Sequence, residues 1–121
     1  MVQNALDNTK EIQDVLLQIG IPANLSGFAY ITCAVQLVLL DSTATHHMVK
    51  GLYVNIANNY NSTPSRVERS IRHAIQVAWT YGDLDYIDDL FKSSVNPLKG
   101  QPTNSQFISR LYYHFLNNYK P

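Results

Sequence analysis

Cysteine is nearly absent from this chain of 121 residues, and Cys33 is its only one. A single thiol excludes an internal disulfide, and without a CxxC partner it does not indicate a metal site. Because Cys33 lies within an apolar stretch, we expect it to pack as a small buried hydrophobe. This cysteine usage fits a reducing cytoplasm.

A long apolar run is also missing. The longest apolar region, residues 28–40, is interrupted by Thr32 and Gln36, and it is shorter than the roughly 20 apolar residues that span a bilayer. Met1 is followed by a polar stretch, not by a basic and then an apolar one, so no signal peptide is expected. The sequence therefore predicts a cytoplasmic protein with no membrane partner.

Charge of one sign is not in excess either, because nine basic residues balance nine acidic ones. A free-standing DNA-binding domain is usually more basic, so this balance counts against nucleic-acid binding unless the charges are segregated. They are partly segregated, since three arginines precede a cluster of four aspartates. These residues are Arg66, Arg69 and Arg72, followed by Asp83, Asp85, Asp88 and Asp89.

What is present is enough apolar material for a core, since hydrophobic residues make up 45% of the chain and charged residues 15%. This composition indicates one folded domain, residues 1–121. Apolar residues recur at helical spacing without strand-like alternation, which predicts an all-α fold of about six helices around a helix-turn-helix. The helical segments are residues 5–19, 26–40, a short one over 45–52 capped by Thr45, 53–60, 64–81, 83–91 and 103–116. Among the apolar residues expected to face the core are Val54, Tyr60, Leu84 and Leu116.

Residues 53–81 are typical of a helix-turn-helix, whose second helix sits in the DNA major groove. Asn61 is expected to take the left-handed backbone conformation of the turn, which asparagine tolerates well. Thr63 is a good N-cap. Pro64 suits the first helical position, because proline lacks a backbone N–H group and the N–H at this position has no acceptor within the helix. The predicted recognition helix therefore runs from about residue 64 to residue 81.

This predicted recognition helix has one apolar and one polar side when each residue advances by about 100°. The apolar side, expected to face the core, holds Val67, Ile71, Ala74, Ile75 and Ala78. The opposite side holds Ser65, Arg69, Arg72 and Gln76, flanked by Arg66 and His73 on one edge and by Glu68 on the other.

The run TPSRVERSIRHAIQVAW, residues 63–79, closely resembles the DNA-binding output domain of the stage-zero sporulation response regulator A family of endospore-forming bacteria. Shorter runs resemble the same family in the same order along the chain. They are IGIPA at residues 19–23, GFAY at 27–30, the segment 52–57, and PTNSQFI at 102–108. The resemblance covers about residues 12–116.

The resemblance implies a helical domain of about six helices that binds a short box in double-stranded DNA, as tandem copies or as a homodimer, and touches the RNA polymerase sigma subunit. An arginine can bond two acceptors on guanine, and a glutamate can accept from cytosine. The contacts that the resemblance implies are Arg66, Glu68, Arg69, Arg72 and His73 of the recognition helix, with Thr63 and Ser65 near the phosphates.

The chain departs from this family in two respects. Asn58 and Asn59 stand where the family tends to carry lysines, and the loss of two charges should weaken non-specific binding. The family's regulators also carry a receiver domain ahead of the output domain. Residues 1–11 are too few for a receiver, so we expect either a fragment of a longer regulator or a stand-alone relative.

Two other classes of function are alternatives to DNA binding. A stand-alone protein-interaction or dimerisation domain, with a degenerate helix-turn-helix that modulates a regulator, would suit the zero net charge, and residues 83–89 would then be its contact surface. An enzyme is not expected, because the sequence has no Ser-His-Asp ordering, HExxH or glycine-rich phosphate loop. Neither a cofactor nor a metal site is predicted.

Overall fold

The computed structural model describes residues 2–40, 48–91 and 100–118, and over these residues its secondary structure consists of α-helices alone. In chain order the helices are α1 (Val2–Ile19), α2 (Ser26–Leu40), α3 (Met48–Asn59), α4 (Pro64–Tyr81), α5 (Leu84–Phe91) and α6 (Asn104–Asn118). The predicted all-α fold is confirmed. No helix within these ranges is both long and apolar enough to cross a membrane.

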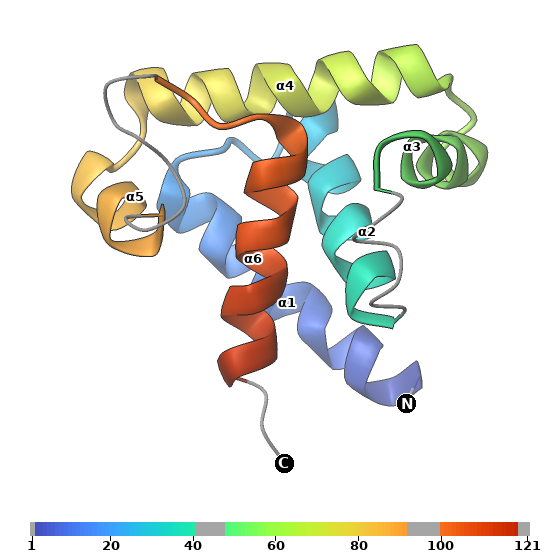
Figure 1. Ribbon diagram of the computed structural model, residues 1–121, viewed down its shortest axis with the longest axis horizontal. Coiled ribbons are helices and arrows are strands. Elements are labelled where there is room, and N and C mark those ends of the chain that lie inside the picture. The colour runs from blue at the N-terminus through green and yellow to red at the C-terminus, as the bar shows by residue number, and fades with distance from the viewer. Residues whose placement is uncertain (1, 41–47, 92–99, 119–121) are drawn as a thin grey trace.

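The long helix α4 lies along one edge of the molecule (Figure 1). Helix α3 packs beside its first turns, α5 follows below its last turns, and α2 and α6 run from its inner side toward α1 at the opposite edge. The fully buried side chains between these helices include Phe107, Ile12, Leu16, Ile19, Ile31, Ile56, Ile71, Ile75, Ile108 and Leu111. Because its neighbours cover α4 from the inner side, its outer side is left to solvent.

Glycines allow two close approaches that position α4. A Cβ on Gly27, near the start of α2, would lie 2.3 Å from the carbonyl oxygen of Ser70 in the middle of α4. Gly20 ends α1 with a φ of +112°, and a Cβ there would lie 2.5 Å from the Cα of Gly82, just after α4. Glycine meets both demands because it has no Cβ and adopts positive φ without strain.

One buried amide ties the start of α6 to α3 and α4. Nδ2 of Asn104 donates to the hydroxyl oxygen of Tyr53 at 3.0 Å and to the carbonyl oxygen of Glu68 at 3.0 Å. Burial raises the pKa of the Tyr53 hydroxyl, which favours its protonated form. These bonds satisfy polar groups that would otherwise be costly to bury, and they hold the predicted helix pair against the rest of the domain.

The structure corrects the predicted boundaries of two helices. The segments 45–52 and 53–60 were expected to be separate, but residues Met48–Asn59 form the single helix α3. No proline interrupts this stretch, so nothing removes a backbone hydrogen bond within it. The predicted cap Thr45 lies outside the described residues. Helix α1 begins earlier than predicted, at Val2.

Four apolar residues that were expected to face the core are exposed instead. The exposed fractions are 46% for Val54, 47% for Tyr60, 60% for Leu84 and 44% for Leu116. The prediction was wrong because helical spacing gives the direction of an apolar side, but not how much of it neighbouring helices cover. Cys33 is half-buried, not fully buried as expected, and burial raises the pKa of its thiol.

Candidate nucleic-acid interface

The turn between α3 and α4 is closed by backbone hydrogen bonds around one left-handed residue. Asn61 has a φ of 53°, which confirms the prediction for this position. The amide of Ser62 donates to the carbonyl oxygen of Ala57 at 2.9 Å, the bond that closes a Schellman motif at a helix end. The direction in which the chain leaves α3 is therefore fixed by local backbone geometry.

Thr63 caps α4, with a φ of −123° and a ψ of 153°. Its hydroxyl oxygen accepts a hydrogen bond from the amide of Arg66 at 3.2 Å, and Pro64 takes the first helical position. Both predictions for the start of this helix are confirmed. The hydroxyl proton of Thr63 is not used in the cap, so capping is compatible with the predicted phosphate contact.

The two sides of α4 are separated as the helical angles predicted. The five residues of its apolar side are each 0% exposed: Val67, Ile71, Ala74, Ile75 and Ala78. Of the predicted contact residues, Glu68 is half-buried, and the exposed ones are Thr63, Ser65, Arg66, Arg69, Arg72 and His73. All seven predicted contact residues are therefore at least partly accessible to solvent.

The three arginines of α4 differ in their surroundings. Nη1 of Arg72 lies 3.4 Å from Oε2 of Glu68, one turn earlier on the same helix. Within the described residues, Arg66 and Arg69 have no carboxylate at salt-bridge distance. Two guanidinium groups are therefore available to an external anion, while the third shares its charge with a carboxylate.

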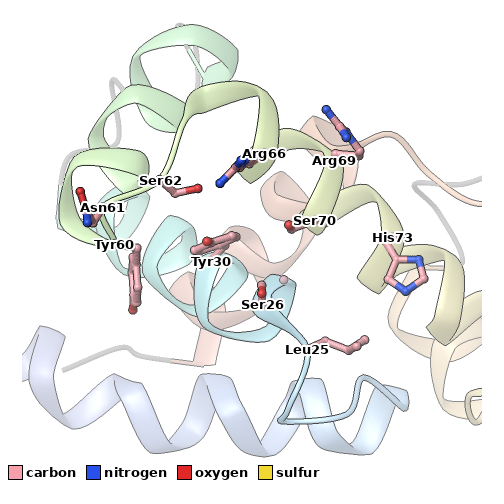
Figure 2. A pocket seen from close by; sticks show the side chains of 11 residues that line it. Leu25, Ser26, Tyr30, Tyr60, Asn61, Ser62, Arg66, Arg69, Ser70 and His73 are labelled. Atoms are coloured by element: carbon pink, nitrogen blue, oxygen red, sulfur yellow. The ribbon is translucent and has the colours of Figure 1, made fainter.

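A groove runs along each flank of α4. The α2-side groove, of about 560 Å³, is lined by Leu25, Ser26, Gly27, Tyr30, Tyr60, Asn61, Ser62, Arg66, Arg69, Ser70 and His73 (Figure 2). The α3-side groove, of about 640 Å³, is lined by Tyr53, Val54, Pro64, Ser65, Glu68, Arg69 and Arg72. Arg69 lines both grooves, so it lies on the crest between them.

The contribution of α2 to this surface was not predicted from the sequence. Ser26 and Tyr30 enter the α2-side groove from a helix far earlier in the chain, and Tyr60 and Ser62 enter it from the turn. Gly27 was a signal in the sequence, because a glycine inside a helix can mark a close approach to another element. Nothing in the helical spacing said which helix would approach.

The end of α3 adds no positive charge beside α4. Asn58 and Asn59 are both exposed. The side-chain amide of Asn59 donates to Oδ1 of Asn55 at 3.5 Å and lies 4.0 Å from Sγ of Cys33. These uncharged amides stand at the two positions where the resemblance implies lysines in the family. Any attraction of a DNA phosphate to this flank of α4 must therefore come from other residues.

These features together define a helix-turn-helix domain. They are the closed turn, the capped second helix with its buried inner side, and the accessible row of arginines. Residues 12–115 match the family described as sporulation initiation factor Spo0A C terminal, and the chain belongs to this family. The family is the DNA-binding output domain of a sporulation regulator and is not an enzyme family.

Proposed function

We propose that this chain is a sequence-specific DNA-binding regulator of transcription that places α4 in the major groove. The observation that carries the proposal is the arginine side of α4, which is accessible along a helix whose opposite side is wholly buried. An 18-residue helix is about 27 Å long, and the major groove, about 12 Å wide, admits a helix of this kind.

The residues of α4 supply complementary means of reading base edges. Arg69 and Arg72 each offer forked donors that fit the two acceptors of guanine, and Glu68 offers an acceptor for the amino group of cytosine. Ser65 lies in the first turn of α4 and lines the α3-side groove, whereas His73 lies further along the helix and lines the α2-side groove. We assign base reading to the crest and the α3-side groove, where Arg69, Arg72 and Glu68 lie together.

The remaining parts of the proposal are inferred from membership of the family. The chain would bind its box as tandem copies or as a homodimer, and would contact the RNA polymerase sigma subunit in the cytoplasm. A second copy would compensate for the uncharged end of α3, because each copy adds its own phosphate contacts to the complex.

Selection of bound sites from a random pool of duplex DNA tests the proposal. We expect one short box to be enriched, either singly or as a repeated unit, and the spacing of repeats would give the arrangement of copies. If no sequence is enriched above the starting pool, sequence-specific DNA binding is wrong.

A protein-interaction or dimerisation domain is the second candidate function. It is favoured by two exposed large side chains, those of Tyr81 at the end of α4 and Leu84 at the start of the acidic helix α5, which are 83% and 60% exposed. Sedimentation equilibrium over a range of protein concentrations would detect self-association through such a surface. Concentration-dependent dimerisation without enrichment of any DNA site would support this alternative.

A further inference from the structure

The segment that leads into α6 runs along α4 and bonds its backbone at two points one helical turn apart (Figure 1). Nδ2 of Asn104 donates to the carbonyl oxygen of Glu68 at 3.0 Å. Nε2 of Gln101 donates to the carbonyl oxygen of Arg72 at 3.5 Å. Glu68 and Arg72 are also the two residues of α4 whose side chains pair on the surface. The backbone of this pair is therefore held by residues that lie outside the helix-turn-helix.

Asn104 provides the more rigid of these two ties. Its side chain is buried, and both hydrogens of its amide are used, because Nδ2 also donates to the hydroxyl oxygen of Tyr53 at 3.0 Å. A rotation of this amide would leave a buried donor without an acceptor, which is costly. The Asn104 amide therefore has one favoured arrangement, and Glu68 is held in register with it.

The start of α6, which carries Asn104, is itself fixed. The amide of Thr103 donates to Oε1 of Gln106 at 2.9 Å, and the amide of Gln106 donates to the hydroxyl oxygen of Thr103 at 3.1 Å. This reciprocal pair is a capping box. In the next position Phe107 is fully buried and stacks on Phe91 of α5, with ring centroids 5.3 Å apart. Asn104 therefore reaches α4 from a rigid support.

An effect of Asn104 on DNA has to pass through α4, because Asn104 is only 8% exposed. Glu68 and Arg72 line the α3-side groove and also a neighbouring groove of about 670 Å³, and Asn104 lines the second of these alone. A carbonyl oxygen has two lone pairs, and one of them serves the bond within the helix. Removal of the Asn104 amide therefore leaves α4 helical but frees its position.

We propose that Asn104 is a positioning residue for sequence recognition, which fixes the backbone of Glu68 and so determines where the paired side chains of Glu68 and Arg72 meet the DNA. This role rests on the proposed function, in which these side chains read bases. Recognition requires side chains to be held within about 0.5 Å of their working geometry by the residues behind them. Asn104 thus contributes to the choice of base without touching DNA.

The test measures discrimination, which is the ratio of the affinity for the duplex selected from the random pool to the affinity for a duplex with one base pair replaced. The position read by Glu68 is the one at which Glu68→Ala loses this ratio. At that position Asn104→Ala should lower the ratio by about three- to tenfold, and it should leave the ratio unchanged at positions read by Arg69. The slope of log affinity against log salt should match wild type, because no phosphate contact is lost.

A double-mutant cycle separates positioning from a merely structural role. If Asn104 acts through Glu68, Asn104→Ala should cause no further loss of discrimination at this position in a protein that already carries Glu68→Ala. Ile108→Val is the matched control, because Ile108 is a fully buried residue of the same helix and makes no contact with the Glu68 carbonyl through its apolar side chain. It should lower stability but leave discrimination unchanged.

Asn104→Asp is a second variant that keeps the shape of the side chain and loses both donor hydrogens at neutral pH. An acidic residue suits the first turn of α6, so this variant keeps the start of the helix. It should lower discrimination at the Glu68 position as Asn104→Ala does. Circular dichroism spectra that match wild type would show that each variant is folded.

Each of three results would overturn this role for Asn104. The first is unchanged discrimination by both folded variants of Asn104. The second is an equal loss at every base position, or an equal loss in Ile108→Val, since either would reflect lower stability alone. The third is a Glu68→Ala protein that keeps full discrimination at all positions. Failure of wild type to prefer any duplex is a different outcome, and it would contradict the proposed function itself.

Discussion

At the scale of single residues, two positions control where α4 lies. The Thr63 hydroxyl accepts the amide of Arg66 and so fixes the first turn of the helix, where amides otherwise have no partner. Gly27 lets α2 reach the backbone of α4 at Ser70. Neither residue is basic, yet together they set the angle and the depth at which the arginines are presented.

We expect Thr63→Ala to lower the free energy of unfolding by about 1 kcal/mol, since an N-cap hydrogen bond is lost. Thr63→Ser keeps the hydroxyl and should remain close to wild type. Urea denaturation followed by circular dichroism measures both variants. Equal stability of Thr63→Ala and wild type would mean that this cap does not contribute to the fold.

Gly27→Ala should lower the free energy of unfolding by about 1–3 kcal/mol, because the new Cβ overlaps the backbone of Ser70 and forces α2 away from α4. Gly51→Ala is the matched control in α3. No atom lies within 4 Å of its added Cβ, so it should raise stability by about 0.5–1 kcal/mol. Thermal or urea unfolding compares the two, and a shift of both in the same direction would contradict this account of the helix crossing.

At the scale of elements, α4 combines a buried side, a crest and two unequal flanks. Its inner side is held by α2, α3 and α6, and the Asn104 amide locks α6 to the carbonyl oxygen of Glu68. Glu68 therefore has its backbone fixed by the fold, while its side chain pairs with Arg72 on the surface. This arrangement orients the residues that we assign to base reading.

Arg72→Ala should cost about 1–3 kcal/mol of binding free energy at a single base position of the selected box. The loss should vanish on duplexes in which that base pair is already replaced, because the contact is then absent in both proteins. Fluorescence anisotropy with a series of single-substitution duplexes provides the measurement. An equal loss on every duplex would identify Arg72 as a phosphate contact.

A feature of this site could be predicted from the sequence when the residues that determine it lie close together along the chain. The left-handed turn at Asn61, the cap at Thr63 and the buried side of α4 were predicted correctly, because each depends on residues within a few positions of one another. The α2-side groove was not predicted, because it joins Ser26 and Tyr30 to Arg66 through tertiary packing. Helical spacing carries no information about which helix packs across another.

At the scale of the whole molecule, a net charge of zero conceals a division along α4. The arginines occupy its first half, and the exposed Asp85, Asp88 and Asp89 belong to α5, which follows its last turn. Phosphates are attracted to one end of the helix and repelled by the other, so DNA contacts should concentrate on the first turns.

The uncharged Asn58 and Asn59 limit the number of phosphate contacts, and we expect a flatter salt dependence than in relatives that carry lysines there.

The central claim is that the exposed arginine side of α4 binds DNA in a sequence-specific manner. Fluorescence anisotropy on the selected duplex with wild type, Arg69→Ala and Lys10→Ala tests it most directly. Lys10 lies on α1, lines neither groove beside α4, and pairs with the exposed Asp14. Both variants lose one positive charge, but Arg69→Ala should weaken specific binding by about tenfold or more, and Lys10→Ala should bind as wild type does. Unchanged specific binding by Arg69→Ala, and by Arg72→Ala alongside it, would contradict the account.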